Sequence, residues 1–192
     1  MKKSFVIAAF ALLFCIAAPA MAKEGLYVGA FVPVEKISGT AADGSDSASG
    51  WGVRAGIGAN RYFAFEANYA TTQHNVALPL PSSMDLRSFA GDFKVNFPLT
   101  SLDSAQVMTL EPYFLFGYTH YEKAQVGATY KSDGPQWGVG IELYLFQELS
   151  LQAGWTKTNV KFNEPSGLAF PPFIDKEGHV ERLEFGLTYH FI

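Results

Sequence analysis

The stretch WGVRAGIGANRYFAFEANYA, residues 51–70, alternates between two kinds of side chain. Every second residue is apolar from Trp51 to Ala59 and again from Phe63 to Tyr69. The residues between them are mostly small, and each half carries one charge, Arg54 or Glu66. Because successive side chains of a strand point to opposite faces, this period of two predicts two β-strands that share an apolar face and are joined by a tight turn.

The same period of two recurs along the chain, without a comparable helical period. Most of the runs are about nine residues long, which is the length that a tilted strand needs to cross the hydrocarbon of a bilayer. The eight runs are Leu26–Val34, Trp51–Ala59, Phe63–Tyr69, Phe89–Phe97, Met108–Tyr118, Trp137–Leu145, Leu149–Trp155 and Leu183–Phe191.

The connections between these runs alternate in length. The first, third, fifth and seventh are long and polar, as in HYEKAQVGATYKSDGPQ after the fifth run, whereas NRY and FQE form two of the shorter ones. Transmembrane barrels have short turns at one end and longer loops at the other. The sequence therefore predicts an all-β fold, an eight-stranded antiparallel up-and-down transmembrane β-barrel in which the eighth run pairs with the first.

The two faces of the runs differ in charge. In the six most regular runs one face is uncharged, and the other carries Arg54, Glu66, Asp92, Lys94, Glu142 and Glu184. Because an arginine or lysine facing lipid costs about 2–4 kcal/mol, six outward charges would lose on the order of 10 kcal/mol, as much as the stability of a whole domain. A soluble sandwich is the alternative, but its outer face should be rich in Lys, Glu, Thr and Ser rather than glycine. We therefore expect the apolar face to meet lipid and the charges to face the lumen.

The N-terminus predicts export. Lys2 and Lys3 precede an apolar run, and Ala20–Ala22 supplies the small residues of a cleavage site, which is the plan of a secretory signal peptide. We expect two segments, a cleaved signal peptide at residues 1–22 and a barrel domain at residues 23–192. The only cysteine, Cys15, leaves with the signal, so no disulfide is expected.

Charge and hydropathy narrow the function classes further. Residues 23–192 contain 12 basic and 18 acidic side chains, a balance that argues against nucleic-acid binding. No apolar segment among them approaches the roughly 20 residues of a membrane-spanning helix.

Charged side chains on the inner face are expected to pair, because a desolvated charge needs a partner or water. The tight turn at NRY pairs positions that sum to 122, which sets Arg54 opposite Asn68 and diagonal to Glu66. The turn at FQE sets Glu142 opposite Gln152, and pairing Phe97 with Met108 sets Lys94 opposite Glu111. The predicted lumen charge network comprises Arg54, Glu66, Asp92, Lys94, Glu111, Glu142, Arg182 and Glu184.

No residue pattern indicates catalysis. His74, His120 and His179 fall in expected outer loops or at their margins, and His190 falls near the opposite rim. A lipid hydrolase would need a serine, a histidine and an acid that converge at the outer rim, and no diagnostic spacing suggests one. We expect no catalytic residue, no cofactor and no metal; the acids of DGSDS are read as a solvated loop rather than a calcium site.

The expected outer loops contain apolar residues that suggest contact with other molecules. The segment SGLAFPPFID carries Leu168, Phe170 and Phe173. Exposed apolar side chains mark contact surfaces in many proteins. These three residues are the candidates for a loop contact, with the barrel rim, lipopolysaccharide or an unknown surface ligand as the alternatives.

Three segments resemble a known family. LYVGAF in the first run, LEPYFLFGYTHYE around the fifth and WGVGIELYLFQELSLQAGW across the sixth hairpin are similar to the OmpA-like outer-membrane barrel superfamily. The resemblance implies an eight-stranded barrel in a Gram-negative outer membrane with internal ion pairs and variable surface loops. It also implies insertion by the barrel-assembly machinery, for which Tyr189 and Phe191 would form the C-terminal signal. The chain ends at LEFGLTYHFI, so tethering to peptidoglycan by a further domain is not carried over.

The leading functional expectation is a monomeric, non-enzymatic envelope protein of the outer membrane, with both mature termini in the periplasm and a polar lumen that conducts at most small ions. A surface adhesin or receptor that acts through its loops is the alternative, and a lipid-modifying enzyme is the third. The expected partners are outer-membrane lipid, lipopolysaccharide and the barrel-assembly machinery.

Overall fold

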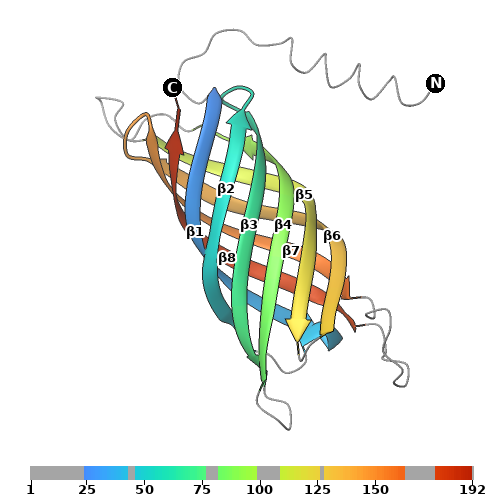
Figure 1. Cartoon of the computed structure of the whole chain (residues 1–192). Coiled ribbons are helices and arrows are strands. Elements are labelled where there is room, and N and C mark those ends of the chain that lie inside the picture. The colour runs from blue at the N-terminus through green and yellow to red at the C-terminus, as the bar shows by residue number, and fades with distance from the viewer. Residues whose placement is uncertain are drawn as a thin grey trace, which may run out of the picture.

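The computed structural model describes residues 24–42, 46–76, 82–98, 109–125, 128–162 and 176–191. These residues form eight antiparallel strands in one closed barrel (Figure 1), with a single 3₁₀ turn, η1, at Thr40–Ala42. The strands are β1 (Gly25–Gly39), β2 (Ala48–Gly58), β3 (Phe63–Val76), β4 (Ser82–Asn96), β5 (Thr109–Gln125), β6 (Ala128–Tyr144), β7 (Leu149–Phe162) and β8 (Lys176–His190).

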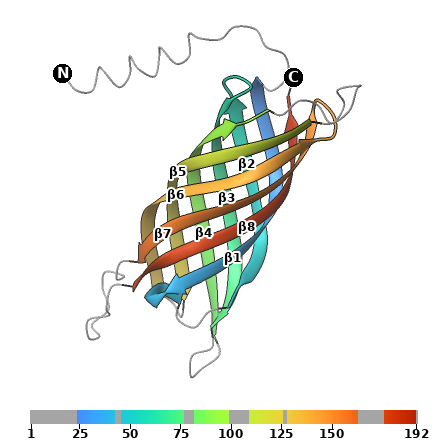
Figure 2. The ribbon, with the colours of Figure 1, turned by 180° about the vertical axis from the view of Figure 1, so that it is seen from behind.

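Each strand pairs with its neighbours in sequence, and β1 pairs with β8 to close the sheet. Seen from both sides, the strands tilt around the barrel, and the start of β1 lies at the same end as the end of β8 (Figure 2). Closure matters in lipid, because a free strand edge would leave backbone N–H and C=O groups unpaired there. The predicted fold class is confirmed.

Two tight turns lie at the end of the barrel where β1 begins, which we call the turn end. Residues 59–62 join β2 to β3, and residues 145–148 join β6 to β7. The side chain of Asn60 accepts hydrogen bonds from the backbone N–H groups of Tyr62 (2.8 Å) and Phe63 (3.0 Å), which fixes the first turn. No helix in the described residues has the length and apolarity that crossing a bilayer requires.

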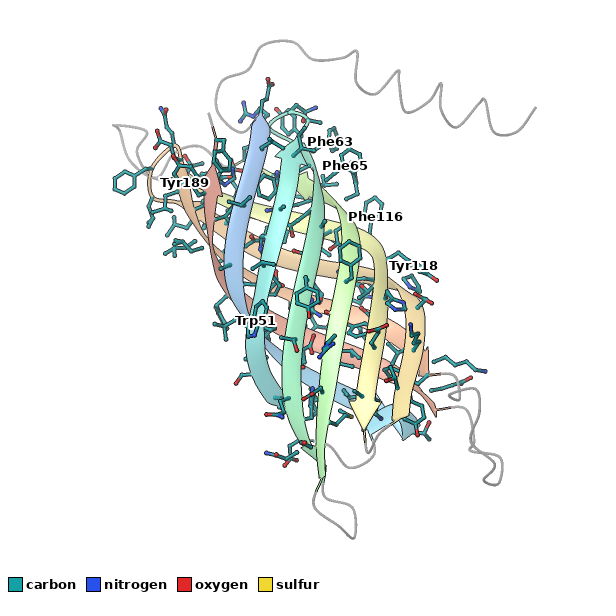
Figure 3. All side chains as sticks on the ribbon, in the orientation of Figure 1. Trp51, Phe63, Phe65, Phe116, Tyr118 and Tyr189 are labelled. Carbon is teal, nitrogen blue, oxygen red and sulfur yellow. The ribbon has the colours of Figure 1, made fainter. Side chains whose placement is uncertain are left out.

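From the turn end, an uninterrupted band of apolar side chains points outward from every strand; we call it the belt. About halfway along most of the strands it ends in aromatic rings, the girdle, formed by Trp51, Tyr69, Phe89, Tyr118, Trp137 and Trp155. Trp51 packs against Tyr69 and Trp137 against Trp155, with ring centroids 5.8 and 5.0 Å apart. Figure 3 shows Tyr189 near one end of the barrel and Trp51 farther along it. The exposed large side chains of the belt include Leu26, Val32, Val53, Ile57, Phe114, Val139, Ile141, Leu151, Phe185 and Leu187.

Beyond the girdle the strands continue, and the polarity of their two faces is reversed; we call this part the extension. Its outward residues include Lys36, Thr71, Gln73, Arg87, Glu122, Lys131, Asp133, Lys157, Asn159 and Glu181. Its inward residues include a buried apolar cluster, the cap cluster, made of Ile37, Met84, Leu86, Tyr121, Val160, Phe162 and Val180. The extension is therefore built like an ordinary water-soluble barrel.

The extension corrects the expected loop lengths. The third and fifth connections are not long, because β3 pairs with β4 as far as Val76 and Ser82, and β5 pairs with β6 as far as Gln125 and Ala128. They comprise only residues 77–81 and 126–127. The fourth connection, which was expected to be among the shorter ones, spans residues 97–108. Strands that leave the membrane carry outward polar residues, which in the sequence resemble loops.

The expected positions of three histidines are wrong for the same reason, because the strands continue where loops were expected. His74, His120 and His179 lie in β3, β5 and β8 rather than in outer loops. His74 is completely buried.

Candidate functional site

The interior of the belt is the candidate site, because buried charged and polar side chains gather there from most of the strands. All eight residues of the predicted charge network are buried in the interior of the barrel, each at most 5% exposed. Only Arg182 lies at the level of the girdle rather than within the belt, since its outward neighbours are Glu181 and Leu183. What these residues do functionally stays a prediction.

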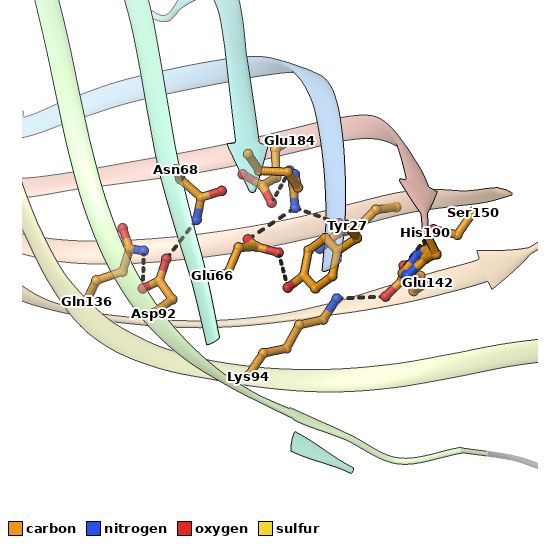
Figure 4. A network of polar contacts seen from close by, with 12 residues as sticks. Tyr27, Glu66, Asn68, Asp92, Lys94, Gln136, Glu142, Ser150, Glu184 and His190 are labelled. Carbon is orange, nitrogen blue, oxygen red and sulfur yellow. Dashed lines mark hydrogen bonds and ion pairs between the residues drawn. The ribbon is translucent and has the colours of Figure 1, made fainter. Parts of the chain in front are cut away.

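Arg54 joins three strands across the lumen, and Figure 4 shows two of its partners, Glu66 and Glu184. Its guanidinium lies 3.0 Å from Glu184 on β8 and 3.5 Å from Glu66 on β3. It also donates a 2.5 Å hydrogen bond to Gln152 on β7, while Tyr27 donates to Glu66 at 3.0 Å. The register that placed Arg54 opposite Asn68 and near Glu66 is confirmed.

The glycines of the opening stretch make room for aromatic rings in this interior. A Cβ atom on Gly52 would strike the ring of Phe31, and one on Gly56 would strike the ring of Tyr27. Phe31 in turn lies under the guanidinium of Arg54, with 4.5 Å between the ring centroid and the central carbon. An eight-stranded barrel is just wide enough for side chains to fill, so small residues on some strands must compensate for rings on others.

Lys94 forms the second ion pair of the belt. Its Nζ lies 2.7 Å from Glu142 on β6 and 4.3 Å from the centroid of the Tyr113 ring. The expected pairing of Lys94 with Glu111 is wrong: Lys94 lies opposite Leu115, and Glu111 lies opposite Glu142. The register differs from the expected one by four residues. A shift by an even number leaves every side chain on its face, so alternation alone could not detect the error.

Asp92 is held by amides rather than by a cation. It accepts hydrogen bonds from Asn68 at 2.8 Å and from Gln136 at 2.9 Å. The oxygen of Gln136 accepts in turn from Thr119 at 2.9 Å and from Thr158 at 3.2 Å. These amides continue the polar network toward the girdle.

Sequence reasoning missed a serine, a histidine and an acid that meet near the turn end. Ser150 donates to Glu142 at 2.6 Å, and Nε2 of His190 lies 3.2 Å from both of them. A nucleophilic triad needs one imidazole nitrogen at the serine and the other at the acid. Here one nitrogen faces both groups and Lys94 neutralises the acid, so the geometry supports packing of the lumen rather than nucleophilic catalysis.

A second polar cluster lies at the level of the girdle. Glu35 accepts from Nε of Arg182 at 2.7 Å and from Thr72 at 2.6 Å, and Arg182 also donates to Ser88 at 2.5 Å. His74 contacts Thr72 at 3.2 Å. The sequence pattern does not indicate Glu35, because the outward apolar residues of the first run end at Val34, although Glu35 continues the inward parity of that run.

The belt interior has an excess of acids. Among the described residues it holds two cations, Arg54 and Lys94, and five carboxylates, those of Glu66, Asp92, Glu111, Glu142 and Glu184. No group of three or more His, Cys, Asp or Glu side chains in this part of the chain is arranged to hold a metal ion. The arrangement can hold the wall strands together and favours cations over anions in any path along the axis.

The remaining site predictions concern the ends of the chain. Tyr189 and Phe191 point outward at the turn end, and the Phe191 N–H donates to the Leu26 carbonyl at 2.9 Å. Their role as an assembly signal stays a prediction. The signal peptide at residues 1–22 and the loop candidates Leu168, Phe170 and Phe173 lie outside the described residues.

Comparisons with known proteins agree with this architecture. Residues 6–191 match the family described as outer membrane protein beta-barrel domain. A search of curated proteins finds no match. Among solved structures, the chain is similar to Neisserial surface protein A, at 17% identity, with 88% of this chain and 98% of that chain covered and a TM-score of 0.61.

Two further structures are similar over the same part of the chain. Outer membrane protein OprG from Pseudomonas aeruginosa is 15% identical, with 88% and 98% coverage and a TM-score of 0.53. Ail, the attachment invasion locus protein of Yersinia pestis, is 11% identical, with 88% and 99% coverage and a TM-score of 0.51. At these identities the likeness shows the fold alone.

Proposed function

This chain belongs to the outer membrane protein β-barrel family, and from that premise we propose that it is a non-enzymatic envelope protein whose lumen is closed at rest. The proposal includes a monomer, since a closed barrel leaves no strand edge for pairing with a second copy. It also includes insertion by the barrel-assembly machinery and contact with outer-membrane lipid and lipopolysaccharide.

One observation carries the proposal: side chains bridge or fill the lumen at three successive levels. Near the turn end, Lys94 on β4 reaches Glu142 on β6. Farther along, Arg54 on β2 reaches Glu184 on β8. Beyond the girdle, the cap cluster fills the interior with apolar side chains. An ion would have to separate buried ion pairs and then cross a section lined mainly by apolar side chains, in which Lys123 is buried as well.

The proposed orientation places the turn end in the periplasm and the extension outside the cell. Its support is the position of the extension, because the strands continue well past the girdle only at the end away from the start of β1. Barrels of this class carry their longer segments outside the cell.

Conductance of the refolded protein in planar bilayers tests the closed lumen. We expect no steady current from the wild type. The double substitution Arg54→Ala with Lys94→Ala removes the two cations of the belt interior and is expected to produce small cation-selective events. Lys131→Gln, which removes an exposed cation of the extension, serves as the control and should remain silent. A steady ohmic current from the wild type would contradict the proposal.

Surface binding is the second candidate function, and the extension favours it. Eight strands that continue past the girdle present a rigid polar wall to water, with ion pairs such as Lys131 with Glu122 at 2.9 Å. Rigid presentation lowers the ordering cost of binding. Truncating the β5–β6 hairpin beyond the girdle and measuring adhesion of whole cells tests this function; unchanged adhesion would remove its support.

A further inference from the structure

The lipid-facing wall is not uniformly bulky, and a groove crosses it over β2, β3 and β4. Its floor consists of Ala55, Ala67 and Gly91, which lie directly opposite one another on the three neighbouring strands. A Cβ atom added at Gly91 would meet nothing within 4 Å, so the space above it is open. The groove has a volume of about 780 Å³ and an almost entirely apolar lining, a size within the roughly 300–1,000 Å³ of ligand pockets.

Aromatic rings form the wall of this groove toward the turn end. The rings of Phe65, Phe93 and Phe116 pack in a row across β3, β4 and β5, tilted to one another, with ring centroids 5.1 and 5.2 Å apart. Tyr118 lies beside Gly91 in the pairing of β4 with β5 and lines the other side. Figure 3 shows Phe65, Phe116 and Tyr118 on one side of the barrel, pointing away from the strands. A long, flat hydrocarbon group fits between such walls.

A cationic side chain, Arg87, lies on the same outer face as the groove, just beyond the girdle. Arg87 is exposed and precedes Gly91 by two outward positions on β4, which corresponds to about 13 Å along the strand. Its neighbour across β5 is Glu122, but that carboxylate already contacts Lys131 at 2.9 Å. Among the described residues no carboxylate forms an ion pair with Arg87. A guanidinium at the headgroup level matches the geometry of a phosphate.

From these two features we propose that the β2–β5 wall binds one lipid of the outer leaflet, with a saturated acyl chain in the groove over Gly91 and a phosphate on Arg87. The charge of Arg87 and the proposed orientation select the phosphorylated lipid A moiety of lipopolysaccharide as the occupant. The inference rests on that orientation, whereas it is independent of whether the lumen conducts.

Binding of lipids to the refolded barrel in uncharged maltoside micelles tests the proposal, with bound lipid counted by native mass spectrometry. The probes are diphosphoryl lipid A, its dephosphorylated form and phosphatidylglycerol. The wild type should retain one molecule of diphosphoryl lipid A in preference to the other two. Gly91→Phe fills the groove and should weaken retention of all three lipids by about tenfold. Arg87→Gln should weaken retention of the phosphorylated form alone, also by about tenfold.

Matched controls separate a site from a general effect of the substitutions. Ala153→Phe adds the same ring to the lipid-facing side of β7, and Lys157→Gln removes a cation just beyond the girdle on that strand; neither should change retention. Heat-modifiable migration on gels establishes that each variant is folded. Equal retention by Gly91→Phe and wild type would overturn the proposal that the groove binds an acyl chain. A preference for phosphatidylglycerol would overturn the assignment to lipopolysaccharide. Accessibility of the extension to protease on whole cells tests the orientation separately.

Discussion

The belt and the extension are made of the same eight strands, yet their faces are arranged in opposite ways. In the belt, Val139 and Ile141 point outward while Arg54 and Glu66 are buried in the lumen. In the extension, most charged residues point outward, and the cap cluster is buried together with Lys123. The pairing of β5 with β6 and that of β7 with β8 run through both regions without a break. The medium outside the wall, hydrocarbon or water, therefore determines which face is apolar.

The two interiors are stabilised by different forces as well. The belt interior depends on ion pairs and amide hydrogen bonds. Removing one partner of such a pair leaves the other charge buried without compensation. The extension interior depends on packed apolar groups. Substitutions at corresponding places in the two regions should therefore destabilise the protein for different reasons. Their expected effects on the free energy of unfolding can be ordered by size.

The largest effect is expected inside the belt. Arg54→Met leaves Glu66 and Glu184 buried without their cation, which should lower the free energy of unfolding by about 3–5 kcal/mol. Urea unfolding of the protein in lipid vesicles measures it. Arg61→Met, the same substitution at an exposed position of the first turn, should change the free energy by less than about 0.5 kcal/mol. Equal losses in the two variants would remove the distinction between lumen and surface.

The next effect is expected inside the extension. Leu86, which is 1% exposed in the cap cluster, should behave like a core residue of a soluble protein, so Leu86→Ala should cost about 3 kcal/mol through the cavity it leaves. Leu86→Met keeps the volume and should cost under about 1.5 kcal/mol. If Leu86→Ala were harmless, the extension would not have a packed interior.

A smaller effect is expected on the outer faces, where the two regions can be compared directly. Val139→Lys places a charge in the belt and should cost about 2–3 kcal/mol. Asn159→Lys places the same charge on the outer face of the extension on the neighbouring strand, and should stay within about 0.5 kcal/mol of wild type. Vesicle-based unfolding of both variants gives the difference. A similar cost at the two positions would show that hydrocarbon does not end at the girdle.

The smallest effect is expected for exposed ion pairs of the extension. The hydrogen bond and charge of Lys131 hold the pKa of Glu122 below its usual range. Because the folded-state pKa is lowered, the contribution is present above the unfolded pKa and is lost as the pH falls through the lowered value. Glu122→Gln should therefore cost under about 1 kcal/mol at pH 7 and nothing at pH 2. A cost that persists at pH 2 would mean that the carboxylate acts by packing rather than by charge.

The sequence predicts the belt well because its apolar residues follow one rule, a period of two with constant parity. Apolar residues keep the same parity from Phe89 to Val95, and a short turn fixes the register of Arg54 opposite Asn68. In the belt, alternation determines the face of each side chain, and turn length determines the register of the strands. Across the fourth connection neither one determined the register, so Lys94 was paired with the wrong acid.

The extension was missed because the parity of the apolar residues changes at the girdle. In β4, Met84 and Leu86 are inward and even-numbered, whereas Phe89, Phe93 and Val95 are outward and odd-numbered. A search for alternation with fixed parity ends a strand at that point. The change of parity is itself the signal that could have located the membrane boundary.

Paramagnetic accessibility of single spin labels tests most directly whether the girdle separates lipid from water. Residues 23–192 contain no cysteine, so labels can be placed singly at Val139 and Ala153 in the belt and at Asp133 and Asn159 in the extension. In lipid vesicles, the first two labels should collide mainly with dissolved oxygen and the last two mainly with a water-soluble nickel chelate. Chelate access at all four positions, or oxygen preference at all four, would contradict the division of the barrel at the girdle.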